Sequence, residues 1–239
     1  MASKRLSGPG SELRLDVVEQ ALAFSQPGLT LHETESFIVA EGEYVVTDGP
    51  NEDGPIAKFQ IRILFSKAYP RDEPLVVETA GEIERVADRH MYSDGGCCTC
   101  IWEEWLVTSV DTSVRAFCEG PLQNFFLGQV AYDRNGRWPF GERAHGAAGV
   151  VEAANAMLGL NTDQIGAVRY LKVLSAGRVK GHWTCPCGSN RRLRNCCANA
   201  IAELRKTFDR SMAERLHVRL TSLVRWERKN LLPARSKAR

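Results

Sequence analysis

Hydrophobic and polar positions follow two different periods in the first eighty residues. The stretch SELRLDVVEQALAFSQPG places apolar residues at helical spacing and stops at Pro27-Gly28, which predicts a helix over about 11–25 with Ser11 as candidate cap. ESFIVAEGEYVVTD, IAKFQIRILFSKAYP and EPLVVETAG are instead rich in β-branched and aromatic residues, as strands are. We therefore expect a helix and then an antiparallel meander, whose first two strands are joined by the turn-forming sequence DGPNEDGP.

Helical spacing dominates after residue 100. WEEWLVTSVDTSVRAFCEGPLQNFFLGQVAYD predicts helices with Pro121 at a bend or a helix start. HGAAGVVEAANAMLGL and NTDQIGAVRYLKVLS predict two more, the second capped by Asn161 or Thr162. Apolar residues three or four apart then predict one long last helix over about 198–229.

Glycine, proline and charged residues concentrate in DRNGRWPFGERAHG, residues 133–146, as is typical of a domain boundary. We expect a first domain over 1–135, a linker with helices over 136–180, a cysteine hairpin over 181–200, and a basic helix and tail over 201–239. The expected fold class is α+β, with a mostly helical C-terminal region.

The composition is that of a globular protein. Of 239 residues, 44% are hydrophobic and 25% are charged. No run of eighteen apolar residues occurs, and the start MASKRLSGPGSELRLD lacks the apolar stretch of a secretory signal. We therefore expect a cytoplasmic protein with no membrane contact. Because cytosolic thiols are kept reduced, the eight cysteines are expected to be metal ligands or nucleophiles and not disulfides.

Charge is distributed unevenly along the chain. Residues 1–177 carry 15 basic and 25 acidic side chains, a net charge of −10, whereas residues 178–239 carry 16 and 4, a net charge of +12. Such a basic block can bind nucleic acid, an acidic partner protein or an acidic domain of its own chain. Its aromatic residues are only Trp183, Phe208 and Trp226, without the interleaved stacking pattern of single-strand binders.

A four-cysteine cluster gives the most specific signal. Cys185, Cys187, Cys196 and Cys197 follow the spacing C-x-C-x8-C-C, with a Pro-Cys-Gly-Ser turn inside it. Four thiolate ligands fill a tetrahedral coordination shell and leave no coordination position open for water. The spacing therefore predicts a closed, structural Zn²⁺ site. WTCPCGSNRRLRNCC also resembles the SEC-C motif, and this resemblance implies a zinc hairpin that serves as an interaction surface.

A second cluster lies in MYSDGGCCTCIWEEW, where Cys97, Cys98 and Cys100 crowd together. As a metal site this cluster needs a fourth ligand, which His90 or Cys118 would supply, although the spacing is tighter than a C-x2-C knuckle. Two other hypotheses stay open. Some of the thiols are buried as small hydrophobic side chains, or one of them is a nucleophile.

The sequences FSKAYPRDEPLVVET, RHMYSDGGCC and WEEW, within about 10–135, resemble the central part of ubiquitin-conjugating enzymes. In that family a strand ends at a Tyr-Pro corner, and an Asp-Gly-x-x-Cys loop presents the active cysteine. Aligned on YSDG, the nucleophile falls on Cys98, with Cys100 as a rival. The family's His-Pro-Asn falls on residues 88–90, so His90 replaces the Asn.

The pattern H-x-x-x-D-G-x-x-C, here His90, Asp94, Gly95 and Cys98, is similar to divergent bacterial relatives found in anti-phage operons or beside ubiquitin-like proteins. The resemblance implies a ubiquitin-conjugating-like sheet and a thioester on Cys98. A separate activating enzyme would deliver the modifier, which then passes to an amine.

The resemblance leaves two residue roles open. His90 either assists the transfer or only pins the loop through its backbone, and Asp94 either orders the turn or acts as a base. The alternative function is a non-catalytic adaptor that uses the same fold and the zinc hairpin to bind partner proteins.

Overall fold

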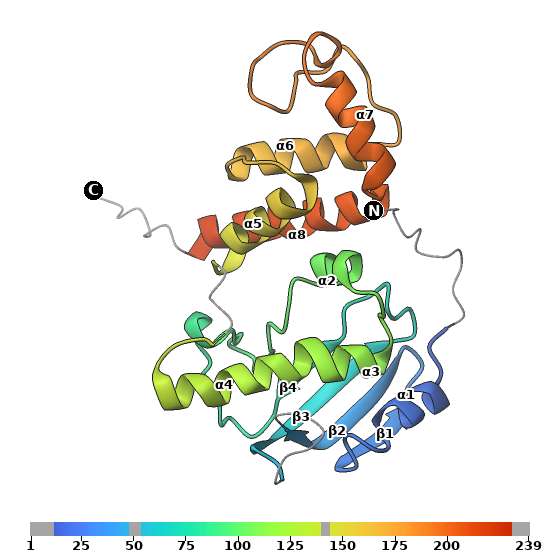
Figure 1. Ribbon diagram of the computed structural model, residues 1–239, viewed down its shortest axis with the longest axis vertical. Helices are drawn as coiled ribbons and strands as arrows, with labels where there is room; N and C mark the ends of the chain where they lie inside the picture. Colours follow the sequence, from blue (N-terminus) through green and yellow to red (C-terminus); the bar gives the residue numbers. More distant parts are fainter. Residues whose placement is uncertain (1–11, 48–53, 140–143, 231–239) are drawn as a thin grey trace, which may run out of the picture. The chain divides into compact units, whose positions relative to one another are not determined.

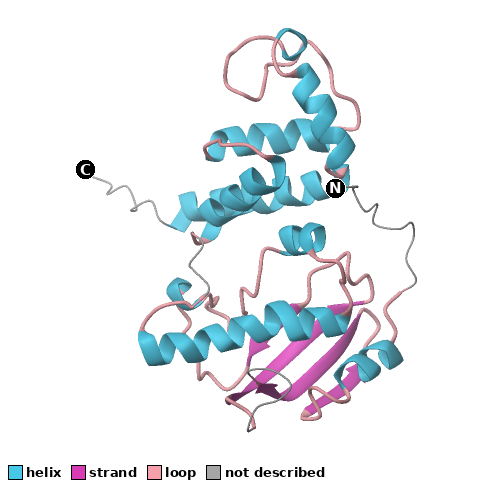
Figure 2. Cartoon of the chain, viewed as in Figure 1, coloured by secondary structure: helices cyan, strands magenta, loops and turns pink. Residues whose placement is uncertain are grey.

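The computed structural model describes residues 12–47, 54–139 and 144–230 (Figure 1). The chain divides into two compact units, one holding the described residues up to 139 and the other those from 144 onward. The first unit combines strands and helices, whereas the second is built from helices and loops (Figure 2). No helix in the described ranges combines the length and the apolar character needed to span a membrane.

The first unit contains an antiparallel sheet. Its strands follow the chain in the order β1-β2-β3-β4. After helix α1 (Leu15–Leu22), the strands are β1 (Leu29–Glu33), β2 (Phe37–Val46), β3 (Ala57–Ser66) and β4 (Leu75–Glu78). The α+β class and the expected antiparallel meander are confirmed. Sequence analysis missed β1, whose five residues LTLHE bury only Leu29.

Strand β3 shows why the meander was predictable. Phe59, Ile61, Ile63 and Phe65 are buried while the residues between them are more exposed, which is the period-two pattern of a half-buried strand. Helix α4 (Gln123–Asn135) covers this buried face (Figure 1). Its Phe126 ring lies 4.6 Å from Phe59, ring centre to ring centre.

Aromatic side chains pack helix α2 (Trp102–Thr108) against the Tyr-Pro corner that follows β3. The Trp102 indole is fully buried, and its N–H donates to the carbonyl of Pro70 at 3.1 Å. Tyr69 donates its hydroxyl to the carbonyl of Ser113 at 2.9 Å. The Trp102 indole N–H and the Tyr69 hydroxyl thus keep hydrogen-bond partners while their rings add apolar contact.

Pro121 lies inside a helical segment and not at a helix start. Helix α3 (Val114–Phe117) continues through a π-helical turn, Cys118–Leu122, directly into α4. A proline cannot donate the usual i→i−4 hydrogen bond, and the wider turn accommodates it.

The second unit packs four helices through small and branched apolar residues. They are α5 (Gly146–Leu158), α6 (Gln164–Ser175), α7 (Ala198–Thr207) and α8 (Arg210–Asn230). Fully buried alanines on α5 and α8, such as Ala147, Ala153 and Ala213, allow the helices to approach closely. The prediction of one long last helix was wrong. The backbone is extended at Phe208, and the Asp209 carboxylate accepts from the N–H of Ser211 at 2.7 Å, which starts α8.

Two predicted caps also differ. Asp163, and not Asn161 or Thr162, caps α6, because its carboxylate accepts from the Gly166 N–H at 2.8 Å. Helix α1 begins at Leu15 with Arg14 as a cap residue that makes no side-chain cap bond. Ser11 and residues 48–53 of the predicted strand connection lie outside the described residues.

Candidate functional site

The loop that carries Cys98 begins at a buried carboxylate. Glu78 ends β4, is 0% exposed, and accepts from the N–H groups of Ala80 and Gly81 at 2.8 and 2.9 Å. The chain then returns to the same strand. The N–H of Cys97 donates to the Val76 carbonyl at 2.8 Å, and the N–H of Glu78 donates to the Gly95 carbonyl at 2.9 Å. The cysteine loop is thereby paired with the edge of the sheet.

The segment YSDGG closes this loop as a tight turn. The Asp94 carboxylate accepts from the Gly96 N–H at 3.0 Å, so its side chain orders the turn. Gly95 has a φ of +89°, and a Cβ placed there would lie 3.0 Å from the Glu78 carbonyl oxygen. Only glycine meets both conditions without strain.

His90 lies next to Cys98 through the backbone. It follows a short 3-10 turn (Ala87–Arg89) with a left-handed φ of 52°, and its carbonyl accepts from the Cys98 N–H at 2.9 Å. The imidazole ring packs edge-on against Trp138, with ring centres 4.7 Å apart. The structure therefore joins the backbones of the predicted residues His90 and Cys98 by a hydrogen bond, and it packs the His90 imidazole against the Trp138 ring.

Helix α4 holds the residues just before His90. The Arg89 guanidinium donates to the side-chain oxygen of fully buried Gln129 at 2.8 Å, and the Gln129 amide donates back to the Arg89 carbonyl at 2.8 Å. Arg89 also pairs with Asp133 at 2.6 Å and lies over the Tyr132 ring, 4.7 Å from its centre.

Trp138 completes this attachment, because its indole N–H donates to the Asp88 carbonyl at 2.9 Å. We call Arg89, Gln129, Asp133 and Trp138 the His90 brace. Sequence reasoning missed all four, since their contacts join positions 40 to 50 residues apart and follow no motif.

The three crowded thiols differ in access. Cys97 is 9% exposed, and burial raises its pKa to about 12. Cys98 and Cys100 are half-buried. Cys118 is buried, and its pKa is also raised by burial. Within the described ranges, the only group of three or more metal-binding side chains close enough to share an ion is the downstream cluster, so the metal hypothesis for Cys97, Cys98 and Cys100 gains no support.

The downstream cluster has the geometry of a metal site. The sulfur atoms of Cys185, Cys187, Cys196 and Cys197 all lie within 4.8 Å of one another. Neighbouring sulfurs are 3.4 Å apart for Cys185 and Cys187, and 3.5 Å apart for Cys187 and Cys196. A tetrahedral ion with metal–sulfur bonds of about 2.3 Å needs sulfurs roughly 3.8 Å apart. These four cysteines can therefore hold a metal ion.

A small hairpin positions these four side chains. The N–H of Cys185 donates to the Arg191 carbonyl at 2.9 Å, and the N–H of Leu193 donates to the Trp183 carbonyl at 2.7 Å. Gly188 and Asn190 take left-handed φ values of 82° and 58° at the tip. Leu193, only 1% exposed, anchors the hairpin in the helical unit.

Local hydrogen bonds favour the thiolate form of two of the four cysteines, which is the form that binds a metal ion. The Ser189 hydroxyl lowers the pKa of Cys187 to about 6 and also lowers that of Cys196. Burial raises the pKa of Cys185, and it raises that of Cys197 to about 12. A bound cation favours the deprotonated form of all four sulfurs, so metal binding would release protons.

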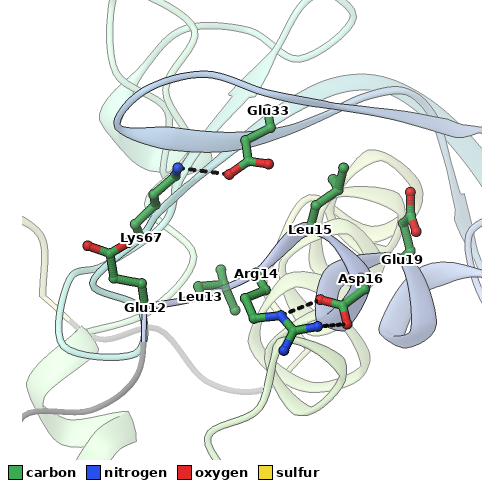
Figure 3. Close-up of a pocket in the computed structure, with 8 residues that line it drawn as sticks. All are labelled: Glu12, Leu13, Arg14, Leu15, Asp16, Glu19, Glu33 and Lys67. Atoms are coloured by element: carbon green, nitrogen blue, oxygen red, sulfur yellow. Dashed lines mark hydrogen bonds and ion pairs between the residues drawn. The ribbon is translucent and has the colours of Figure 1, made fainter.

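The first unit also has a pocket beside the start of α1 (Figure 3). Both of its basic side chains pair with carboxylates, Lys67 with Glu33 at 2.8 Å and Arg14 with Asp16, and the carboxylates of Glu12 and Glu19 also line it. No cysteine or histidine lines it. We assign it no chemistry.

No protein-family model, curated protein or solved structure matches the chain. Its function must therefore be inferred from its own residues.

Proposed function

We propose that the first unit is a ubiquitin-conjugating-like transferase that carries the C-terminus of a ubiquitin-like modifier as a thioester on Cys98. The observation that carries this proposal is the loop after β4. It returns to the sheet edge, joins the Cys98 N–H to the His90 carbonyl at 2.9 Å, and leaves Cys98 half-buried next to the more deeply buried Cys97.

The proposed chemistry is two successive acyl transfers. The Cys98 thiolate attacks the modifier's C-terminal carbonyl, which is bound as a thioester to a separate activating enzyme. A new S–C bond forms and the activating enzyme's thiolate leaves. An acceptor amine then attacks the same carbonyl, a C–N bond forms, the Cys98 thiolate leaves, and the amine loses a proton. His90 would accept that proton or donate a hydrogen bond to the oxyanion, and Asp94 holds the turn.

We favour Cys98 over the other two thiols of the cluster. Cys97 is buried with its pKa at about 12, so almost none of it is thiolate at neutral pH. Cys98 is the cysteine of this cluster whose backbone N–H donates a hydrogen bond to the His90 carbonyl. Cys100 remains the rival, and the experiment below separates the two.

For the downstream cluster we propose structural Zn²⁺. Four soft thiolates favour zinc over hard cations, and a complete thiolate shell leaves no position for a reactive water. Structural zinc contributes roughly 10–16 kcal/mol of apparent free energy in small peptides, which suffices for a hairpin with little core of its own.

The protein would act in the cytoplasm of a bacterium, in a conjugation or anti-phage pathway.

The test uses the full-length protein with candidate activating enzymes, ATP and modifiers. We expect an adduct on non-reducing gels that dithiothreitol removes. Cys98→Ser should convert it to an ester that resists dithiothreitol but not hydroxide, whereas Cys100→Ser should leave the thioester intact. The reverse pattern would assign the nucleophile to Cys100. Stable binding of activating enzyme and modifier with no adduct would replace the proposal with the adaptor function.

A further inference from the structure

The helical unit contains a long stretch without a single carboxylate. Residues 164–202 include seven lysines and arginines and no aspartate or glutamate. This stretch covers α6, the cysteine hairpin and the start of α7. Its charge is therefore concentrated around the hairpin and is not balanced by neighbours in the chain.

The structure separates basic residues that serve the fold from those that do not. Arg191 donates to the sulfur of Cys196 at 3.3 Å. Arg205 donates to the Ala176 carbonyl at 2.8 Å, and Arg210 donates to the Ser175 carbonyl at 3.1 Å, so both bind the C-terminal end of α6. Cations at that end satisfy open carbonyls and offset the helix dipole.

Four other basic residues have no such role. They are Arg178, Lys180, Arg192 and Arg194, which we call the hairpin cations, and all four are exposed. Among the described residues, none of the four forms an ion pair with a carboxylate.

The hairpin fixes two of these cations on its outer side. Thr184 and Arg192 form a bridge across the hairpin, and the Arg194 N–H donates to the Gly181 carbonyl at 2.9 Å. Leu193, between the two arginines, points into the unit and is 1% exposed. Arg192 and Arg194 are therefore held at solvent by a well-defined backbone, so little backbone entropy would be lost on binding.

The surroundings of the hairpin cations indicate the kind of partner. From residue 166 to residue 217, all of them described, no large apolar side chain is exposed. Protein interfaces usually take their affinity from a buried apolar or aromatic centre, and residues 166–217 offer no exposed side chain for one, the nearest along the chain being Ile165 and Val218. Binding to a phosphate backbone needs no such centre, because cations release condensed counterions, and guanidinium groups match phosphate oxygens.

We propose that the hairpin cations bind the phosphate backbone of a nucleic acid without reading its sequence. The inference rests on the second unit alone and stands whether or not Cys98 forms a thioester. Sequence preference is not expected, since no phenylalanine, tyrosine or tryptophan between residues 166 and 217 is exposed for bases to stack on.

Fluorescence anisotropy with the full-length protein tests this proposal. The probes are labelled twenty-nucleotide single-stranded RNA, the matching single-stranded DNA and its duplex, each titrated between 50 and 300 mM NaCl. We expect measurable binding that weakens steeply with salt. The variant R178Q/K180Q/R192Q/R194Q should bind single strands at least about tenfold more weakly at 100 mM NaCl, and the slope of log K against log[salt] should fall by roughly 3, because each lost phosphate contact removes about 0.7.

A matched control carries the same change in net charge. R14Q/K58Q/R62Q/K67Q removes four cations that each pair with a carboxylate in the first unit. It should bind as the unchanged protein does. Circular dichroism and metal content verify that both variants are folded.

Three results would overturn the proposal. The hairpin variant could retain its affinity and salt slope, or the control could lose as much as the hairpin variant does. Polyglutamate could also compete as well as the oligonucleotides, which would point to an acidic protein. Comparison of RNA, DNA and duplex tells which nucleic acid supplies the phosphates, and binding to any of them that depends on the hairpin cations supports the proposal.

Discussion

Adjacent thiols in the cysteine loop differ in burial. Because the Cys97 sulfur is shielded and its pKa is about 12, it stays protonated at neutral pH, whereas Cys98 is half-buried. Sequence reasoning could locate the loop from Asp94, Gly95 and three cysteines, but not which thiol is protected. That distinction depends on Val76 and Glu78, which pair with the returning chain.

Alkylation with iodoacetamide at pH 8 should therefore distinguish these thiols. We expect Cys98 to react at least about 100-fold faster than Cys97, because reactivity follows the thiolate fraction and access. Peptide mass spectrometry over time measures both sites in one sample. In denaturant the difference should disappear. Equal rates in the native protein would contradict the burial of Cys97.

The raised pKa of Cys97 also predicts an effect on stability at high pH. A thiol whose pKa is raised on folding favours the folded state at low pH, and this contribution is lost as pH rises from the unfolded value of about 8.5 toward the folded value. Between pH 9 and pH 11, stability of the unchanged protein should fall more steeply than that of Cys97→Ala, by up to about 1.4 kcal/mol per pH unit. Urea unfolding at each pH checks this, and parallel curves would contradict it.

The His90 brace predicts a large effect from a residue that no motif identifies. Arg89→Ala leaves the side-chain oxygen of buried Gln129 without its charged donor, so the free energy of unfolding should fall by about 2–3 kcal/mol. Arg134→Ala, an exposed neighbour on α4, should change it by less than about 0.5 kcal/mol. Urea unfolding measures both, and equal values would show that the brace is not formed.

At the scale of elements, period and burial explain what could be predicted. Strand β3 alternates cleanly between buried and exposed residues, and its prediction was correct. Strand β1 lies at the sheet edge with one buried residue, so it left almost no period-two signal. The break between α7 and α8 was missed because apolar spacing continues through Phe208 and Met212. Asp209 was the available signal.

We accordingly expect Asp209 to stabilise the protein as the N-cap of α8. Asp209→Ala removes the acceptor for the Ser211 N–H and should cost about 1 kcal/mol at pH 7. The bond to Ser211 lowers the pKa of Asp209, so its stabilisation is present above the ordinary carboxyl pKa and is lost as pH falls through the folded value. Denaturation at pH 7 and near pH 2 should show a difference between the two proteins only at pH 7. Glu214→Ala, exposed on α8, is the control.

At the scale of the whole molecule, the two units predict separable responses to metal removal. A chelator should release the four-cysteine cluster and increase amide hydrogen exchange over 181–197, since metal binding is coupled to folding of such hairpins. Exchange in β3, in the other unit, should stay unchanged. Mass spectrometry of the intact protein measures the metal, and deuterium uptake measures the response. A purified protein without metal, or uniform exchange throughout, would contradict this prediction.

The Glu78 carboxylate at the end of β4 limits which residues of the cysteine loop can be substituted. Both Glu78 oxygens accept from backbone N–H groups, so glutamine would present a donor where an acceptor is needed. Gly95 has no room for a side chain beside the Glu78 carbonyl. A library that tests how loop residues affect the proposed acyl transfer on Cys98 should therefore keep these two residues constant and diversify Ser93 and Thr99. Selection would then act on the surface of the loop and not on its ability to form.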